Sequence, residues 1–347
     1  MSVPLFKKHI IAVVWDFDKT LTPDYMQSPL FRHYGLNAKE FWDEVNAVEE
    51  FYRFRGLDLV TRDTLYLNHI LTYVRHDKLP GLTNEKLREL GQEIEFYPGM
   101  PGFLGEIKRV AELPDYQNQD IQIEHYIVST GLRAMIQGSR IAPEVEYVWA
   151  CEFVSETPEP GFLKGQAKYE IALEDISKED ATSEADRKPI ADIGYAIDNT
   201  TKTRAIFEIN KGVTKERGIS VNDYINHEDR RVPFENMIYI ADGPSDVPVF
   251  SLIKSNGGKT FAVYNPESKD EFKQVNQLHA QGRITNHGPA DYREGSHTHK
   301  LIMCAVQDIS DRIVKARKLA IAQRVGKEPK HLSGSPAPSK PEILPPS

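Results

Sequence analysis

The stretch Ile10-Ile11-Ala12-Val13-Val14-Trp15-Asp16-Phe17-Asp18-Lys19-Thr20 contains the features that decide the fold. Residues 10–15 are all apolar and most are β-branched, which is typical of a central strand that helices cover on both faces. Polar residues begin at Asp16, directly after this strand. In open α/β sheets, ligands bind outside the carboxyl ends of the strands. The pattern therefore predicts a parallel sheet with a functional site that begins at Asp16.

Further apolar stretches predict strands of the same sheet at Ile121–Val128, Tyr147–Val154, Met237–Ala241 and Thr260–Tyr264. Polar residues follow two of these strands directly. Ser129-Thr130-Gly131 comes after the first, and Asp242-Gly243-Pro244-Ser245-Asp246 comes after Met237–Ala241. If the strands are parallel neighbours, these polar residues meet at one edge of the sheet. We expect an α/β fold with a doubly wound, Rossmann-like parallel sheet.

Between the first two strands the sequence has helical periodicity. An N-cap pattern at Asn37–Glu40 precedes apolar residues spaced as on one helix face. The segment ends in turn residues at Tyr97-Pro98-Gly99-Met100-Pro101-Gly102. We expect residues 23–97 to form an inserted helical cap. Its aromatic residues are expected to pack in its core: Phe41, Trp42, Phe51, Tyr52 and Phe54.

The rest of the chain divides into a core and a tail. Residues 1–22 and 98–326 are expected to form the α/β catalytic core, with a possible insertion at about 155–190. Apolar residues from Ile302 to Ala320 step by three and four, which predicts an amphipathic helix. Residues 327–347 are rich in Pro, Ser and Gly and are predicted to be a disordered tail.

The composition narrows the class of protein. A chain of 347 residues with 40% hydrophobic and 27% charged residues is a globular protein of about two folding units. Its net charge of −8 disfavours nucleic acid as a partner. The apolar stretch at residues 10–15 is too short to span a membrane, and we expect a soluble, cytoplasmic protein with no membrane partner. Cys151 and Cys304 are expected to be buried, reduced thiols. The oligomeric state is not indicated.

Four carboxylates at two strand ends indicate a metal site. Asp16 and Asp18 follow the first strand, and Asp242 and Asp246 follow another. Carboxylates this close repel one another unless a hard cation lies between them. An oxygen-only set of ligands suits Mg²⁺ better than zinc.

Mg²⁺ among carboxylates commonly acts on phosphate esters, where it neutralises charge on the phosphoryl oxygens. Either Asp16 or Asp18 can attack phosphorus while the other handles the proton. Ser129 and a lysine such as Lys202 can hold the phosphoryl oxygens.

These motifs resemble those of the haloacid dehalogenase superfamily. Its first motif, an apolar strand followed by Asp-x-Asp-x-Thr, matches Asp16-Phe17-Asp18-Lys19-Thr20. Its second, an apolar strand that ends in Ser or Thr, matches Tyr126-Ile127-Val128-Ser129, and its fourth matches Asp242-Gly243-Pro244-Ser245-Asp246. The resemblance extends over roughly residues 8–265. Among capped members, phosphoserine phosphatases are nearest in layout, although no residue here selects serine.

The resemblance implies roles for the matching residues. Asp16 would attack phosphorus and form an aspartyl-phosphate, and Asp18 would protonate the leaving group and then activate water. Ser129 would bind a phosphoryl oxygen, with Thr130 and Gly131 beside it. Mg²⁺ would be held by Asp16, the Asp18 backbone carbonyl and Asp242, with Asp246 acting directly or through water.

The third motif of the superfamily is a lone lysine, which a pattern cannot locate. Lys202, at the start of a predicted helix, is our choice as a catalytic and substrate-binding residue, ahead of Lys211 and Lys164.

The expected activity is Mg²⁺-dependent hydrolysis of a small phosphorylated metabolite. Two alternatives remain open from the sequence. A phosphotransferase or mutase would replace water with an acceptor hydroxyl, and a non-catalytic module would only bind the phosphorylated ligand.

Overall fold

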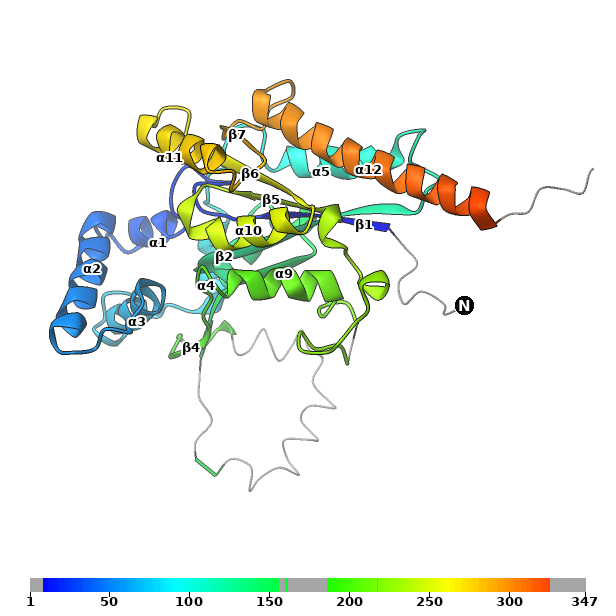
Figure 1. Cartoon of the computed structure of the whole chain (residues 1–347). Coiled ribbons are helices and arrows are strands. Elements are labelled where there is room, and N and C mark those ends of the chain that lie inside the picture. Colours follow the sequence, from blue (N-terminus) through cyan, green and yellow to red (C-terminus); the bar gives the residue numbers. More distant parts are fainter. Residues whose placement is uncertain (1–8, 156–159, 162–185, 217, 325–347) are drawn as a thin grey trace, which may run out of the picture.

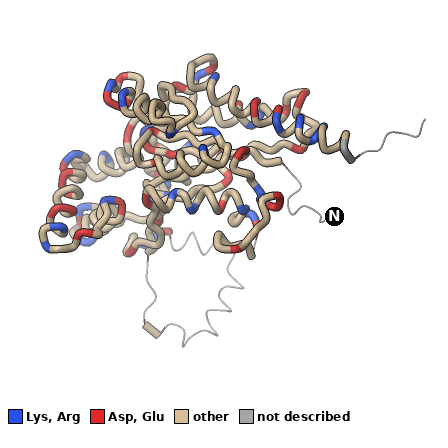
Figure 2. The backbone as a smooth tube through the Cα atoms, viewed as in Figure 1, with Lys and Arg blue, Asp and Glu red and all other residues tan. Residues whose placement is uncertain are grey.

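The computed structural model describes residues 9–155, 160–161, 186–216 and 218–324. Within these ranges, every helix is too short or too polar to cross a membrane. Lys and Arg are interspersed with Asp and Glu over the molecule in the view of Figure 2.

In the described part of the chain, a seven-stranded sheet forms the centre, in the order β4-β3-β2-β1-β5-β6-β7. All neighbouring strands are parallel except β3 and β4, which are antiparallel. The strands are β1 (His9–Trp15), β2 (Ile121–Leu132), β3 (Tyr147–Val154), β4 (Asp192–Tyr195), β5 (Met237–Ala241), β6 (Lys259–Tyr264) and β7 (Asn286–Pro289).

Helices cover both faces of the sheet (Figure 1). Helices α5 and α12 lie on one face, where α12 contacts α5, β1 and β7, and α9 and α10 lie on the opposite face. Residues 10–15 of β1 are at most 3% exposed because both layers cover them. The helices of the core are α5 (Gly102–Arg109), α6 (Arg133–Gly138), α9 (Lys202–Lys211), α10 (Val247–Ser255), α11 (Lys269–Ala280) and α12 (His297–Arg324).

The order of the strands explains where a site forms. The chain adds β2 and β3 on one side of β1 and then β5, β6 and β7 on the other side. A crevice opens at such a switch point because the connections leave β1 and β5 on opposite faces. The carboxyl ends of β1, β2 and β5 therefore meet at the same edge.

The segment between β1 and α5 contains four helices, α1 (Ser28–His33), α2 (Ala38–Phe54), α3 (Arg62–Arg75) and α4 (Asn84–Gly91). Helices α2 and α3 lie away from the sheet (Figure 1), whereas α4 packs on α6 of the core. This contact requires glycine, since a Cβ on Gly91 would lie 2.1 Å from the Met135 carbonyl oxygen and a Cβ on Gly138 would lie 1.9 Å from that of Arg88. The domain boundaries at 22 and 97 stay a prediction.

The predicted fold class, a doubly wound α/β sheet, is confirmed. Five of the strands lie where the apolar stretches predicted them, but β4 and β7 were not predicted because they are short and only partly apolar.

Some expectations about individual residues were wrong. Cys151 is buried, but Cys304 is exposed because it lies on an outer face of α12. In the cap, Phe51 and Phe54 are exposed rather than packed, since they lie on the outer side of α2 near its end. The predicted tail and most of the possible insertion lie outside the described residues.

Candidate active site

Asp16 follows β1, and the turn after it folds around the Phe17 carbonyl. That carbonyl accepts the backbone N–H groups of Thr20 at 3.3 Å and of Leu21 at 2.8 Å. The turn closes because Lys19 adopts a left-handed conformation with φ of 59°, which is uncommon for a residue other than glycine. The Thr20 hydroxyl thereby donates to Asp16 Oδ2 at 3.0 Å.

Lys202 is the first residue of α9, and its ammonium group is buried between two carboxylates. Its Nζ donates to Asp16 Oδ1 at 2.8 Å and to Asp246 Oδ1 at 2.7 Å. Burial alone would lower the pKa of Lys202, but the charges of Asp16 and Asp246 outweigh it and raise that pKa. The ammonium is therefore a fixed positive charge in the site.

The end of β5 supplies the other acidic groups. Asp246 is fully buried, and its carboxylate also accepts hydrogen bonds from the Tyr239 hydroxyl and from Ser245 Oγ, the latter at 2.7 Å. Asp242 is half-buried and has no hydrogen bond or ion pair with a side chain in the described ranges. Among the described residues it is thus a carboxylate with no hydrogen-bonded or ion-paired side chain, next to two other carboxylates.

Asp16, Asp242 and Asp246 form the described group that could hold a metal ion. One carboxylate oxygen of each lies within 4.8 Å of the others. Burial raises the pKa of Asp16 to about 6 against the opposing charge of Lys202. Burial, together with the charges of Asp16 and Asp246, raises the pKa of Asp242 well above its usual value. One ammonium does not neutralise three carboxylates, and a divalent cation with oxygen ligands fits the remaining charge.

Asp18 lies outside this group and is held from the cap side. The backbone N–H of Met26, in the segment that leads to α1, donates to Asp18 Oδ1 at 2.7 Å. Burial and the nearby charge of Asp16 raise the pKa of Asp18 to about 8. At neutral pH its side chain is mostly protonated in the metal-free protein, which is the form that a proton donor requires.

Ser129, Thr130 and Gly131 form an irregular part of β2. The pairing of β2 with β3 shifts between Val128 and Leu132, and bulges of this kind re-aim backbone and side chains next to functional sites. The Gly131 N–H donates to Ser129 Oγ at 3.0 Å. All three residues line the same cavity as Asp16.

This cavity has a volume of about 640 Å³ and lies between the core and the helices of residues 28–75. Its wall on the core side contains Asp16, Asp18, Ser129, Lys202 and Asp242. The opposite wall contains Tyr25, Gln27, Lys39, Trp42, Asp43, Asn46, Arg62, Asp63 and Tyr66. The acidic group therefore faces a space large enough for a small molecule.

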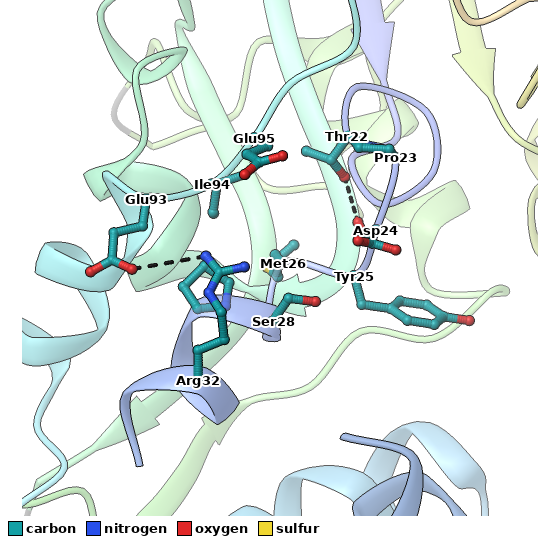
Figure 3. A pocket seen from close by; sticks show the side chains of 11 residues that line it. Thr22, Pro23, Asp24, Tyr25, Met26, Ser28, Arg32, Glu93, Ile94 and Glu95 are labelled. Atoms are coloured by element: carbon teal, nitrogen blue, oxygen red, sulfur yellow. Dashed lines mark hydrogen bonds and ion pairs between the residues drawn. The ribbon is translucent and has the colours of Figure 1, made fainter. Parts of the chain in front are cut away.

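A much smaller hollow, of about 30 Å³, separates the two segments that connect this cap region to the core (Figure 3). The Thr22 hydroxyl donates to the Asp24 carbonyl at 2.7 Å, and Arg32 lies 3.9 Å from Glu93 across the hollow (Figure 3). Both side chains of the ion pair are more than half exposed, so it adds little stability. The hollow is too small for a substrate.

The structure brings together Asp16, Asp18, Ser129, Lys202 and Asp242 around one cavity, with Asp246 buried behind them. It does not bring Lys211 there, since that ammonium donates to the carbonyls of Val221 and Asp223. Lys164 lies outside the described residues.

Sequence reasoning missed several residues near the site. Tyr239 contacts Asp246 from within a strand whose residues are all apolar or aromatic, so no pattern marks it. Met26 contributes a backbone N–H, which no side-chain pattern reveals. Trp42 packs against the hydrophobic core, as expected, and also lines the cavity.

The chain has a relative of similar length among known proteins. It is 36% identical, over 300 residues, to a Borreliella burgdorferi protein described as an uncharacterized protein; the match covers 86% of this chain and 96% of the relative. The two chains belong to one family. No protein-family model matches the present chain.

Solved structures with a similar arrangement include a HAD-family hydrolase from Salmonella enterica serovar Typhi. The similarity has a TM-score of 0.44 with 13% identity, over 80% of this chain and 66% of the Salmonella chain. A phosphoserine phosphatase in apo form gives a TM-score of 0.41 with 17% identity, over 83% of this chain and 97% of that chain. The order of the strands and the convergence of Asp16, Lys202, Asp242 and Asp246 agree with what the sequence resemblance to the haloacid dehalogenase superfamily implies.

Proposed function

We propose that the protein is a Mg²⁺-dependent phosphatase that hydrolyses a small phosphomonoester through a phosphorylated Asp16. The observation that carries the proposal is the environment of the Asp16 carboxylate. Lys202 and Thr20 each hold one of its oxygens, and the carboxylates of Asp242 and Asp246 lie within 4.8 Å. Such a carboxylate is fixed in orientation beside two carboxylates that could hold a cation with it, and it lines the cavity.

Asp16 is the nucleophile of this proposal. In the first step, an Asp16 oxygen forms a bond to phosphorus as the bond between phosphorus and the leaving oxygen breaks. Lys202 and Ser129 line the same cavity, and in this proposal they donate hydrogen bonds to the phosphoryl oxygens. A second attack, by water, releases phosphate and restores the carboxylate.

Asp18 handles the proton in both steps. Its carboxyl gives a proton to the leaving oxygen and, once ionised, accepts one from the attacking water. The Met26 N–H holds the carboxyl on the cavity side of the turn, so that it does not compete with Asp16 for Lys202.

Asp16, Asp242 and Asp246 are the side chains that would hold Mg²⁺, whose charge would offset that of the phosphoryl oxygens and of the carboxylates. The proposed substrate is a small phosphorylated metabolite. The cavity wall opposite the carboxylates contains cationic, amide and aromatic side chains that could contact such a molecule.

The test is hydrolysis of an aryl phosphate by the full-length protein with Mg²⁺. Asp16→Asn keeps the size of the side chain but removes the nucleophile, and it is expected to lower kcat by a factor of about 10⁴ or more. The matched control is Asp270→Asn, which changes an exposed carboxylate on α11 and is expected to leave activity unchanged. A wild-type protein without activity, or an active Asp16→Asn variant with an unchanged circular dichroism spectrum, would overturn the proposal.

A further inference from the structure

A hydrogen bond connects the cap to the core beside Ser129. Tyr66 lies on α3 and is 5% exposed. Its hydroxyl donates to the backbone carbonyl of Thr130 at 2.6 Å. Cys151 Sγ on β3 donates to the same carbonyl at 3.3 Å. A backbone carbonyl of the core therefore accepts a hydrogen bond from a side chain of the cap region.

The same peptide group also contacts Ser129. The Thr130 carbonyl and the Gly131 N–H belong to one planar unit and point to opposite sides of it. The carbonyl accepts from Tyr66, and the N–H donates to Ser129 Oγ at 3.0 Å. Fixing the carbonyl therefore fixes the direction of the N–H.

This arrangement determines what the Ser129 hydroxyl can do. Its oxygen already accepts the Gly131 N–H, and no acceptor for its hydrogen occurs among the side chains and backbone that the structure describes. Because Ser129 lines the cavity, the hydrogen is available to an oxygen of a bound molecule. Rotation of the peptide unit would remove the constraint on the serine oxygen.

We propose that Tyr66 is a positioning residue that orients the Thr130–Gly131 peptide and, through it, the Ser129 hydroxyl toward the phosphoryl group. The inference rests on the proposed phosphatase function and deepens it. Tyr66 reaches the peptide from α3, so the phosphoryl-binding group is complete only when the cap region contacts the core.

The test is a double-mutant cycle between Tyr66→Phe and Ser129→Ala. Tyr66→Phe keeps the ring and removes one hydroxyl, and it is expected to lower kcat/KM for an aryl phosphate about tenfold. In the Ser129→Ala background the same substitution is expected to change kcat/KM less than twofold, because its effect passes through Ser129. An equal loss in both backgrounds, or no loss in either, would overturn the inference.

Tyr73→Phe is the matched control. Tyr73 lies on the same helix, and its hydroxyl donates to Glu44 at 2.6 Å, within the cap. It is expected to change kcat/KM less than twofold, since its hydrogen bond does not reach the core. If it lowers kcat/KM as much as Tyr66→Phe does, the effect belongs to the cap as a whole and the inference is wrong.

Cys151→Ala and a phosphate-binding measurement test the inference independently of Tyr66→Phe and of turnover. Cys151→Ala removes the longer hydrogen bond to the same carbonyl and is expected to lower kcat/KM in the same direction but by less. Binding of inorganic phosphate with Mg²⁺, measured by calorimetry, does not depend on turnover. If the wild type binds phosphate without hydrolysing esters, the proposed function fails, and weaker binding by Tyr66→Phe and Ser129→Ala alike still supports the inference. Unchanged phosphate binding by Tyr66→Phe would overturn it, as would a wild type that binds no phosphate.

Discussion

Two buried clusters of charged side chains lie toward opposite ends of the central strands, and they are built differently. The first, here called the carboxyl-end cluster, contains Asp16, Asp242, Asp246 and Lys202. The second, the amino-end cluster, contains Glu124, Tyr126 and Arg231, in which Arg231 donates to both Glu124 oxygens, at 2.7 and 2.5 Å.

The clusters differ in whether their charges balance. Burial alone would raise the pKa of Glu124, but the hydrogen bonds and charge of Arg231 lower it below its ordinary value. At the other end, three carboxylates face one ammonium, and the pKa values of Asp16 and Asp242 are raised. In a balanced buried cluster each charge offsets the burial cost of the other, so that loss of one partner is costly, whereas an unbalanced cluster costs stability until a ligand supplies the missing charge.

The largest expected effect on stability comes from the balanced cluster. Glu124→Gln leaves the Arg231 charge buried without its counter-charge, and we expect the free energy of unfolding to fall by about 3 kcal/mol. Urea unfolding followed by circular dichroism measures it. The folded variant should retain the wild-type kcat/KM, and a variant as stable as the wild type would remove the contrast between the two clusters.

His125, next to Glu124 in β2, shows the effect of burial on the pKa of a side chain that has no charged partner in its hydrogen bonds. Trp15 Nε1 donates to His125 Nδ1, and His125 Nε2 lies 3.0 Å from the Leu104 carbonyl; burial lowers the pKa of His125 to about 3. The unfolded chain binds this proton near pH 6.5 and the folded chain does not. Stability is therefore fully present above that pH and falls below it, by up to about 1.4 kcal/mol per pH unit.

Urea unfolding between pH 7 and pH 5.5 measures this slope. His125→Gln should reduce it, whereas His76→Gln, which changes an exposed cap residue, should leave it unchanged. Equal slopes in all three proteins would show that His125 titrates in the folded state as it does in the unfolded chain.

Asp242→Asn is expected to change the free energy of unfolding least, and to increase it. The folded-state pKa of Asp242 is raised, so its ionised form destabilises the metal-free fold at pH 7.5. Asp242→Asn should therefore raise the free energy of unfolding in EDTA, by roughly 1 kcal/mol, the size of a typical single substitution. Mg²⁺ should raise the Tm of the wild type and not that of the variant. Lower stability of the variant in EDTA would contradict the charge imbalance.

Much of the fold follows from the sequence because apolar runs and the polar residues after them are local signals. The stretch at residues 10–20 and the one around Asp242 were sufficient to predict a parallel sheet and the edge where acidic groups meet. The strands β4 and β7 were missed because each is too short to show a period.

The candidate site was less predictable where it depends on contacts between distant segments. The sequence left three lysines as candidates for the third motif. The structure distinguishes Lys202, because its Nζ lies 2.8 Å from Asp16 Oδ1. Tyr66 and Met26 reach the site from the cap, so their roles depend on how the cap docks. No spacing within the chain encodes that docking.

The most direct test of the central claim is to trap a phosphoryl group on Asp16. Asp18→Asn should still accept phosphoryl from an activated aryl phosphate but should lose the group that activates water, so the phosphorylated protein should accumulate. Acid quenching, proteolysis and mass spectrometry of the peptide that contains Asp16 identify the site. The account predicts one base-labile phosphoryl group on Asp16 in this variant and none in Asp16→Asn. Hydrolysis without a phosphorylated Asp16, or a phosphoryl group on another residue, would contradict it.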